Sequence, residues 1–152
     1  MLLADVRNEA RGRVRPLARH DVPVVAAMIA RLVVRQEGPP RIDAATLETA
    51  LRAPAPSIQG LVAERFGYVV GYALMVMDAM PHILDLQQLF VIEGSRGRGL
   101  GRALAKAAAD LAREAGCDRL VAHVPAGRSH AQGFYTALGF DNDGEHPVLV
   151  LT

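Results

Sequence analysis

The chain has 152 residues, of which 51% are hydrophobic and 22% are charged, and its formal net charge is +1 at pH 7. These values are ordinary for a soluble globular protein, and we expect residues 1–152 to form a single domain. So small a net charge argues against a nucleic-acid backbone as the main partner. No apolar run approaches the roughly 20 residues of a membrane-spanning helix, so no membrane partner is expected.

Cysteine usage and the first residues of the chain bear on its compartment. Cys117 is the only cysteine, so an internal disulfide is excluded, which fits a reducing environment. Residues 1–15 carry scattered charges and no apolar stretch of the kind that secretory signals contain. We therefore expect a cytoplasmic protein.

The first third of the chain predicts a short strand and two helices. The strand closes near Val14, ahead of Pro16. Asp21 is a candidate N-cap for a helix that ends before residues 38–40, and Asp43 is the candidate cap of a shorter second helix. The apolar face of the first helix is expected to consist of Val24, Val25, Met28, Ile29, Leu32 and Val33.

The middle of the chain predicts strands. Residues 61–64 and 68–76 are rich in β-branched and aromatic residues and flank a turn at Phe66-Gly67, which is typical of an antiparallel hairpin. Pro81 separates this hairpin from another strand at residues 83–92.

The last third alternates helices and strands. Helical periodicity runs from residue 99 to residue 115 and again from 131 to 138, and strands are expected at 120–124 and 148–151, with a further short strand near Phe140. The order β-α-α-β-β-β-α-β-α-β predicts an α/β fold with a mixed sheet and helices on both faces.

The most informative motif is Arg-Gly-Arg-Gly-Leu-Gly at residues 96–101, between a strand and a helix. Glycine permits positive φ and a close backbone approach to a ligand. The first turn of a helix offers amide N–H groups without helical partners, and its dipole favours an anion. With Arg96, Arg98 and Arg102 beside it, this turn predicts an anion-binding site.

Other phosphate motifs do not fit this turn. No Walker A sequence exists, and the dinucleotide fingerprint would place its last glycine at Arg102 or Leu104. An arginine-glycine tract that binds RNA is a further alternative, but this tract is short and leads into an apolar-faced helix. A turn without a ligand is the remaining alternative, although three glycines would then weaken a helix start without benefit.

The sequence here resembles the GNAT superfamily of N-acetyltransferases. Residues 96–101 match its [Arg/Gln]-x-x-Gly-x-[Gly/Ala] signature, and Leu-Phe-Val at 89–91 matches the end of the strand before it. Residues 131–140 resemble its Ala-x-x-x-Tyr-x-x-x-Gly-Phe ending, and the hairpin at 61–76 also fits. The resemblance covers the chain from about Val14. It implies a mostly antiparallel sheet with one splayed parallel strand pair.

The resemblance implies acetyl-CoA as co-substrate, with no metal. The strand end would pair with the pantetheine arm, the turn would hold the pyrophosphate, and Tyr135 would protonate the leaving thiolate. Many relatives carry an asparagine at the position of Arg128, which could serve a phosphate instead. The residues implied in cofactor binding are Leu89, Phe90, Val91, Arg96, Gly97, Arg98, Gly99, Leu100, Gly101, Arg102 and Arg128.

The general base is less defined by the sequence. Some relatives use a glutamate of the fourth strand as the base, and Asp85 and Gln87 lie at two positions used for it. Asp85 could accept a proton, orient water or attract a cationic substrate, whereas Gln87 cannot take a proton. Asp78 and Glu37 could also attract an amine. The histidines show no metal-ligand spacing, so no metal is expected.

The leading hypothesis is an enzyme that transfers the acetyl group of acetyl-CoA to a primary amine of a small molecule or protein by direct attack. The alternative is a non-catalytic acyl-CoA-binding regulatory module. Dimers are common in the family, so a homodimer is an open expectation.

Overall fold

The computed structural model describes residues 11–35, 42–52, 57–77, 82–124, 129–142, 144 and 146–151. Within them the chain forms a 6-stranded sheet in the order β1-β2-β3-β4-β5-β6. Neighbouring strands are antiparallel except β4 and β5, which are parallel. The strands are β1 Arg13–Pro16, β2 Ile58–Arg65, β3 Tyr68–Met77, β4 Ile83–Val91, β5 Arg119–Ala122 and β6 Val148–Val150.

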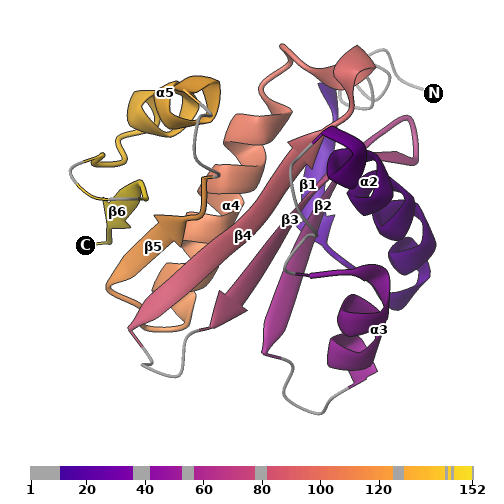
Figure 1. The fold of residues 1–152 in the computed structure, drawn as a ribbon, viewed down its shortest axis with the longest axis horizontal. Coiled ribbons are helices and arrows are strands. Elements are labelled where there is room, and N and C mark those ends of the chain that lie inside the picture. Colours follow the sequence, from indigo (N-terminus) through magenta and orange to yellow (C-terminus); the bar gives the residue numbers. More distant parts are fainter. Residues whose placement is uncertain are drawn as a thin grey trace, which may run out of the picture.

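Helices cover both faces of this sheet. The described helices are α2 Val22–Arg35, α3 Ala44–Arg52, α4 Leu100–Glu114 and α5 Ser129–Ala137, with 3₁₀ turns η1 Arg19–Asp21 and η2 Glu93–Ser95. Helix α4 lies across one face, and α2 and α3 lie on the other, over β2 and β3 (Figure 1). Helix α5 lies beyond the end of β5. The part of this face around β5 and the first half of β4 lies away from α2 and α3. The predicted mixed sheet, with its one parallel pair, is confirmed.

Each face of the sheet has its own apolar core. On the α4 side, small residues bring the helix close to the sheet, because alanines occupy most of its buried stripe. The buried residues of that stripe are Leu100, Leu104, Ala105, Ala108, Ala109 and Ala112. On the other side, α2 and α3 pack over Val62, Tyr72 and Leu74. No described helix is long and apolar enough to cross a bilayer.

The predicted order of elements is confirmed, and three local predictions differ from the structure. Val24 does not belong to the buried face of α2, because it is 37% exposed while Val25, Met28 and Ile29 are buried; the side chains of residues 32–35 are not among those described. The strand expected near Phe140 is a single bridge between Asp141 and Val148. The third difference concerns Asp21.

Asp21 does not act as the N-cap of the long helix but closes the turn before it. Its Oδ2 accepts a hydrogen bond from the Ala18 amide at 2.8 Å, and the two carboxylate oxygens accept from the Arg15 guanidinium at 2.7 and 2.9 Å. The Nε of Arg15 also lies 3.2 Å from Glu64, which accepts from Arg13 at 2.6 Å. These bonds join β1, β2 and the entrance of α2 at the β1 edge of the sheet.

The hydrogen bonds from Arg15 hold the pKa of Asp21 below its usual range. Replacing Asp21 by Asn removes the charge and leaves the Arg15 guanidinium facing an amide. We expect a loss of about 2–3 kcal/mol in the free energy of unfolding at pH 7, measured by urea denaturation. The control is Glu48→Gln, which removes an exposed pair with Arg52 and should cost less than about 0.5 kcal/mol. Equal losses in the two variants would contradict this role.

The same contact predicts a pH dependence. A carboxylate whose folded pKa is lowered contributes stability above its unfolded pKa and loses that contribution as the pH falls through the folded pKa. The stability difference between the wild type and Asp21→Asn should therefore be constant near neutrality and narrow as the pH falls below 3.8, the ordinary value for this group. A difference that stays unchanged between pH 7 and pH 2 would show that Arg15 does not act through this charge.

Candidate functional site

The centre of the candidate site is the point at which β4 and β5 separate. The parallel ladder runs from Ile83 to Leu86, and its last bond is donated by the His123 amide to Leu86 O at 2.9 Å. The next residue, Gln87, is an extra residue in β4, because Leu86 and Gln88 pair with consecutive residues of β3. Such a bulge bends a strand and increases its twist. Beyond it, β4 continues along β3, while the ladder with β5 has ended and α5 lies beyond the end of β5 (Figure 1).

The second half of β4 therefore presents backbone groups to the side that β5 has left. Ile92 N donates to Val70 O at 2.9 Å, so Ile92 and Val70 are a hydrogen-bonded pair of the antiparallel ladder with β3. Because hydrogen-bonded pairs alternate along such a ladder, the amide and carbonyl of Phe90 face β3, and those of Leu89 and Val91 point away from it. Leu89 and Val91 therefore form a half-strand edge with which an extended ligand can pair.

The predicted turn continues from this edge. Gly97 and Gly99 have φ values of +78° and +82°, a region that favours glycine, and a Cβ at either position would meet no atom within 4 Å. Gly99 is the N-cap of α4, and the first helical bond is donated by Ala103 to Gly99 O at 2.9 Å. The amides of residues 100–102 precede that bond, so they are available to an anion in front of the turn.

Of the three arginines around the turn, Arg96 has a structural role as well. Its Nε donates to Val91 O at 2.8 Å, and its guanidinium carbon lies 5.7 Å from the centre of the Phe90 ring. This contact fixes the end of β4 to the start of the turn. Arg98 and Arg102 are exposed at the turn and the first turn of α4, where they can approach phosphate groups.

Helix α5 closes the other side of the β4 edge. A Cβ on Gly101 would lie 3.4 Å from the Phe134 ring and 3.8 Å from Leu89, so α4, α5 and β4 meet closely at this point. Tyr135 is buried, with its ring centre 5.0 Å from that of Phe134 and 5.1 Å from that of Phe140. This burial raises the pKa of Tyr135 above its ordinary value, so the phenol keeps its proton at physiological pH.

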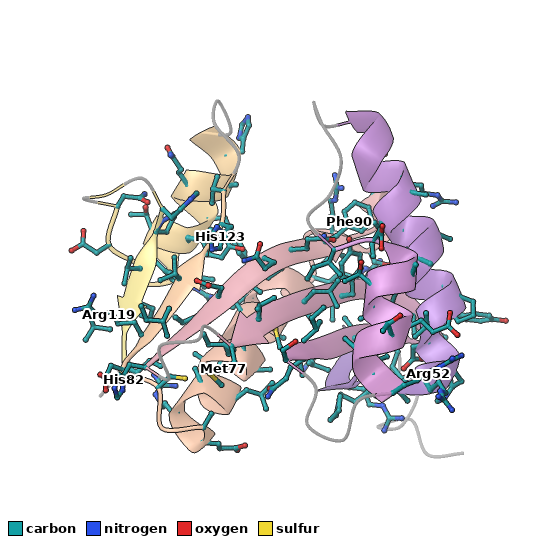
Figure 2. The ribbon with its side chains drawn as sticks, turned by 60° about the horizontal axis from the view of Figure 1, so that its bottom comes forward. Arg52, Met77, His82, Phe90, Arg119 and His123 are labelled. Atoms are coloured by element: carbon teal, nitrogen blue, oxygen red, sulfur yellow. The ribbon has the colours of Figure 1, made fainter. Side chains whose placement is uncertain are left out.

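Asp85 lies on the opposite face of the sheet from Tyr135. It alternates with Leu84 and Leu86, whose side chains belong to the core under α4, and so it lies on the face that α2 and α3 partly cover. Its Oδ1 is 3.2 Å from Nε2 of His123. Figure 2 shows Phe90 beneath α2 and α3, and His123 beside β4 in the uncovered part of the sheet.

Several predicted residues fall elsewhere. Arg128, Glu37 and Asp78 lie outside the described residues. Cys117 is buried at the far end of α4 from the turn, with its sulfur 3.5 Å from that of Met77. Burial raises the pKa of the Cys117 thiol, which disfavours a nucleophilic thiolate.

Two side chains near the site were not identified from the sequence. Gln88 accepts a hydrogen bond from the Tyr72 hydroxyl at 2.9 Å and donates to Ile42 O at 3.2 Å, so it ties β4 to the start of α3. His146 packs on His123 with ring centres 4.6 Å apart. Neither residue belongs to a local motif. Only the assembled sheet brings each beside its partner.

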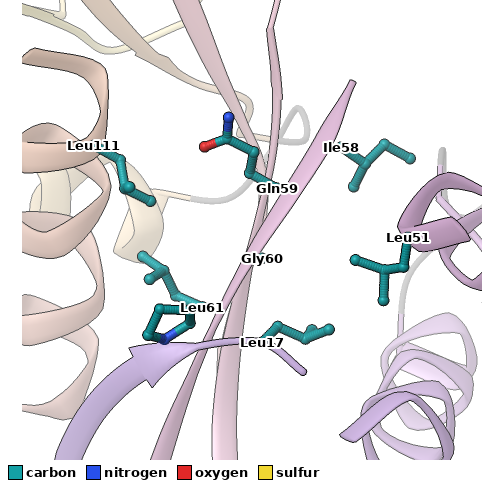
Figure 3. A pocket seen from close by; sticks show the side chains of 8 residues that line it. Leu17, Leu51, Ile58, Gln59, Gly60, Leu61 and Leu111 are labelled. Atoms are coloured by element: carbon teal, nitrogen blue, oxygen red, sulfur yellow. The ribbon is translucent and has the colours of Figure 1, made fainter. Parts of the chain in front are cut away.

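Two hollows in the surface lie away from the β4 edge. An apolar one of about 220 Å³ lies near β2, between α3 and α4, and its described lining includes no ionisable side chain (Figure 3). A larger one of about 370 Å³ runs along α4 toward β6 and is bordered by Arg102, Lys106 and Arg113. Neither is lined by Asp85 or Tyr135, the two predicted catalytic residues.

These features fit the coenzyme A moiety implied by the sequence. Leu89 and Val91 offer an edge to the amides of a pantetheine arm. The turn offers amides, two exposed arginines and open space at Gly97 and Gly99 to a pyrophosphate. Among the described residues, no group of three His, Cys, Asp or Glu side chains is arranged to hold a metal ion.

Comparison with known proteins agrees with this geometry. A family model described as the acetyltransferase (GNAT) family matches residues 27–140. The chain is 38% identical over 77 residues to streptothricin acetyltransferase from Streptomyces lavendulae. That alignment covers 49% of this chain and 39% of the relative, so the chain matches well under half of that protein's length.

Solved structures share the fold over most of the chain. The yncA protein of Salmonella typhimurium, solved with its cofactor acetyl-CoA, has a TM-score of 0.78 at 20% identity, over 93% of this chain and 95% of its own. A ribosomal-protein-alanine N-acetyltransferase from Brucella melitensis has a TM-score of 0.74 at 24% identity, over 91% and 99%. N-acetylglutamate synthase from Neisseria gonorrhoeae, complexed with coenzyme A and L-arginine, has a TM-score of 0.70 at 20% identity, over 92% and 33%.

The two ends of α4 allow a matched test of the turn. Gly99 and Gly116 have φ values of +82° and +80°, and a Cβ on either meets nothing within 4 Å. Valine at either position should cost similar stability, because a left-handed conformation is strained by about 1–2 kcal/mol. Only Gly99→Val should weaken coenzyme A binding, by about tenfold or more in calorimetry, since its side chain fills the space before the amides. Equal affinity in the two variants would refute the assignment of the turn.

Proposed function

Because the chain belongs to the acetyltransferase (GNAT) family, we propose that it transfers the acetyl group of acetyl-CoA to a primary amine by direct attack of the amine on the thioester. The observation that carries this proposal is the free edge of β4 at Leu89 and Val91, with an anion-binding turn at one end and a buried tyrosine beside it. Along one elongated molecule, the acid matches the sulfur, the edge matches the pantetheine arm, and the turn matches the pyrophosphate.

The cofactor would be held mainly by backbone groups. The amide and carbonyl of Leu89 and the amide of Val91 are free to pair with pantetheine amides, whereas Val91 O already accepts from Arg96. The amides of residues 100–102, with Arg98 and Arg102, would hold the pyrophosphate. Arg128 remains a candidate for a further phosphate contact.

Placement on the edge also polarises the reacting group. An N–H of β4 that points away from β3, such as that of Val91, can donate to the thioester carbonyl oxygen. That oxygen gains negative charge as the amine attacks, so a fixed donor stabilises the transition state more than the ground state. The ladder with β3 holds the donor in place, because the flanking amides are bonded to that strand.

Tyr135 is proposed as the acid that serves the leaving group. Departure of the acetyl group leaves a thiolate, which needs a proton or a strong hydrogen bond. The raised pKa of the buried Tyr135 keeps the phenol protonated, so it is available as a donor whenever the thiolate forms. Packing between Phe134 and Phe140 fixes the ring and leaves rotation of the hydroxyl as its main freedom.

The acceptor would approach from the other face of the sheet. Asp85 lies there, and its carboxylate would attract a cationic amine toward the point where β4 and β5 separate. The names of similar proteins include both a small-molecule and a protein acceptor, streptothricin and ribosomal-protein alanine. A search for the acceptor should therefore contain both classes of amine.

The proposal is tested by binding and turnover together. Calorimetry should show binding of acetyl-CoA, and thiol release should appear with at least one amine from a panel of polyamines, amino acids, aminoglycoside-like amines and peptides. The absence of binding at millimolar acetyl-CoA would overturn the proposal. Binding without thiol release from any amine would favour the non-catalytic acyl-CoA-binding module instead.

Tyr135→Phe tests the proposed acid. The substitution keeps the ring contacts and removes only the hydroxyl, so acetyl-CoA affinity should stay the same while kcat falls by about 10²-fold. Tyr68→Phe is the matched control, because Tyr68 is 75% exposed, and its kcat should not change. Thiol-release kinetics measure both variants. An unchanged kcat in Tyr135→Phe would remove the acid role.

A further inference from the structure

His123 is placed at the junction of β4 and β5 by its own backbone. Its amide makes the last bond of the ladder, to Leu86 O at 2.9 Å. Leu120 and Ala122 of β5 point into the core beneath α4, so by alternation His123 lies on the opposite face, together with Asp85. The side chains of His123 and Asp85 are 19% and 20% exposed, so both are mostly shielded from solvent.

The imidazole of His123 has unused hydrogen-bonding capacity. Both ring nitrogens are buried, and neither has a hydrogen-bond partner among the described residues. Nε2 lies 3.2 Å from Asp85 Oδ1, within the distance of an ion pair with a protonated ring but without the alignment of a hydrogen bond. Leaving both nitrogens of a buried imidazole unpaired is costly. A modest rotation would pair Nε2 with Asp85 and leave Nδ1 for a ligand.

The neighbours of His123 favour one arrangement of its protons. Asp85 on β4 favours a hydrogen on Nε2, which leaves the lone pair on Nδ1. His146, in the segment before β6, packs on the His123 ring at 4.6 Å, and its own Nδ1 lies 3.4 Å from the Val124 amide as an acceptor. A positive charge on His123 would therefore face one carboxylate and no competing cation among the described residues.

We propose that His123 is the catalytic base for the acceptor amine and that Asp85 is its positioning residue. This rests on the proposed acetyl transfer. Nδ1 of His123 takes one proton from the ammonium group, directly or through one water, and the freed electron pair of nitrogen forms the bond to the acetyl carbon. The carbon–sulfur pair leaves with sulfur, which takes the Tyr135 proton. The second proton lost by nitrogen restores Tyr135, and the His123 proton passes to solvent.

The role of Asp85 differs here from the base considered from the sequence. Its carboxylate stabilises the imidazolium and selects the tautomer, and it does not itself take the proton of the amine. Removing it should weaken catalysis less than removing His123. This order distinguishes a histidine base oriented by a carboxylate from a carboxylate base with a histidine beside it.

The test uses His123→Gln and Asp85→Asn, with His82→Gln as the matched control. His82 also lies near an aspartate, at 3.7 Å from Asp118, but this pair is exposed at the other end of β4. With the most active amine of the panel, kcat/KM at pH 7 should fall by about 10²-fold or more in His123→Gln and about tenfold in Asp85→Asn. It should not change in His82→Gln. Acetyl-CoA affinity should be the same in all four proteins.

The pH profile and a spectroscopic measurement complete the test. Near pH 10 a primary amine loses its proton to water without a base. At that pH, kcat/KM of His123→Gln should be only a few fold below that of the wild type. In the protein without substrates, nitrogen NMR of the imidazoles should show His123 as the Nε2–H tautomer, and this preference should weaken in Asp85→Asn. That second measurement needs neither turnover nor a folded His123→Gln protein.

The outcomes separate this inference from the proposed function. If the wild type turns over and His123→Gln has the same pH profile of kcat/KM, the assignment of His123 as the base is overturned while the proposed function stands. An Nδ1–H tautomer of His123 in the wild type would have the same consequence. Equal losses in His123→Gln and His82→Gln would also contradict it, because a general effect of histidine removal would then account for the loss. A wild type that releases no thiol with any amine would overturn the proposed function itself.

Discussion

The arrangement of the site depends on the separation of β4 from β5. Backbone N–H and C=O groups are strong donors and acceptors that need partners, and the second half of β4 has β3 on one side only. The bulge at Gln87 coincides with the last rung at Leu86, so the change in strand direction and the end of the ladder have one local cause. The groups left over at Leu89 and Val91 can pair with an extended, amide-containing molecule, except Val91 O, which already accepts from Arg96.

The rest of the molecule holds that separation in place. Helix α4 spans the sheet and carries the turn at its N-terminus, and its alanine-rich stripe lets it lie close to the strands. Helix α5 meets the same point through Phe134, against Gly101 and Leu89. At the far edge, Arg15 joins β1 to β2 and to the start of α2, which fixes the helical layer over β2 and β3. At the junction of β4 and β5, Tyr135 therefore lies on the α4 side of the sheet and Asp85 lies on the other side.

The sequence predicts the parts of this site that depend on local conformation. The turn at 96–101 and Tyr135 are identifiable because glycine spacing and a helical tyrosine motif are short-range features. Which backbone groups of β4 point away from β3 cannot be predicted from the sequence, because this depends on the bulge at Gln87 and on the pairing with β3. The proximity of His146 likewise requires β6 to add beside β5. The sequence predicts the wrong role for Asp21, because an aspartate before a helix suits either a helix cap or a preceding turn, and Arg15 of β1 decides between them.

The central claim is that alternate amides at the end of β4 are free in the protein and become paired by the cofactor. Residue-resolved hydrogen exchange, with and without coenzyme A, tests it most directly. Without coenzyme A, the amides of Phe90 and Ile92 should be protected by β3, while those of Leu89 and Val91 should exchange much faster. Coenzyme A should slow exchange at Leu89 and Val91 and leave the other two unchanged. Protection of Leu89 and Val91 in the free protein, or no change on binding, would contradict the account.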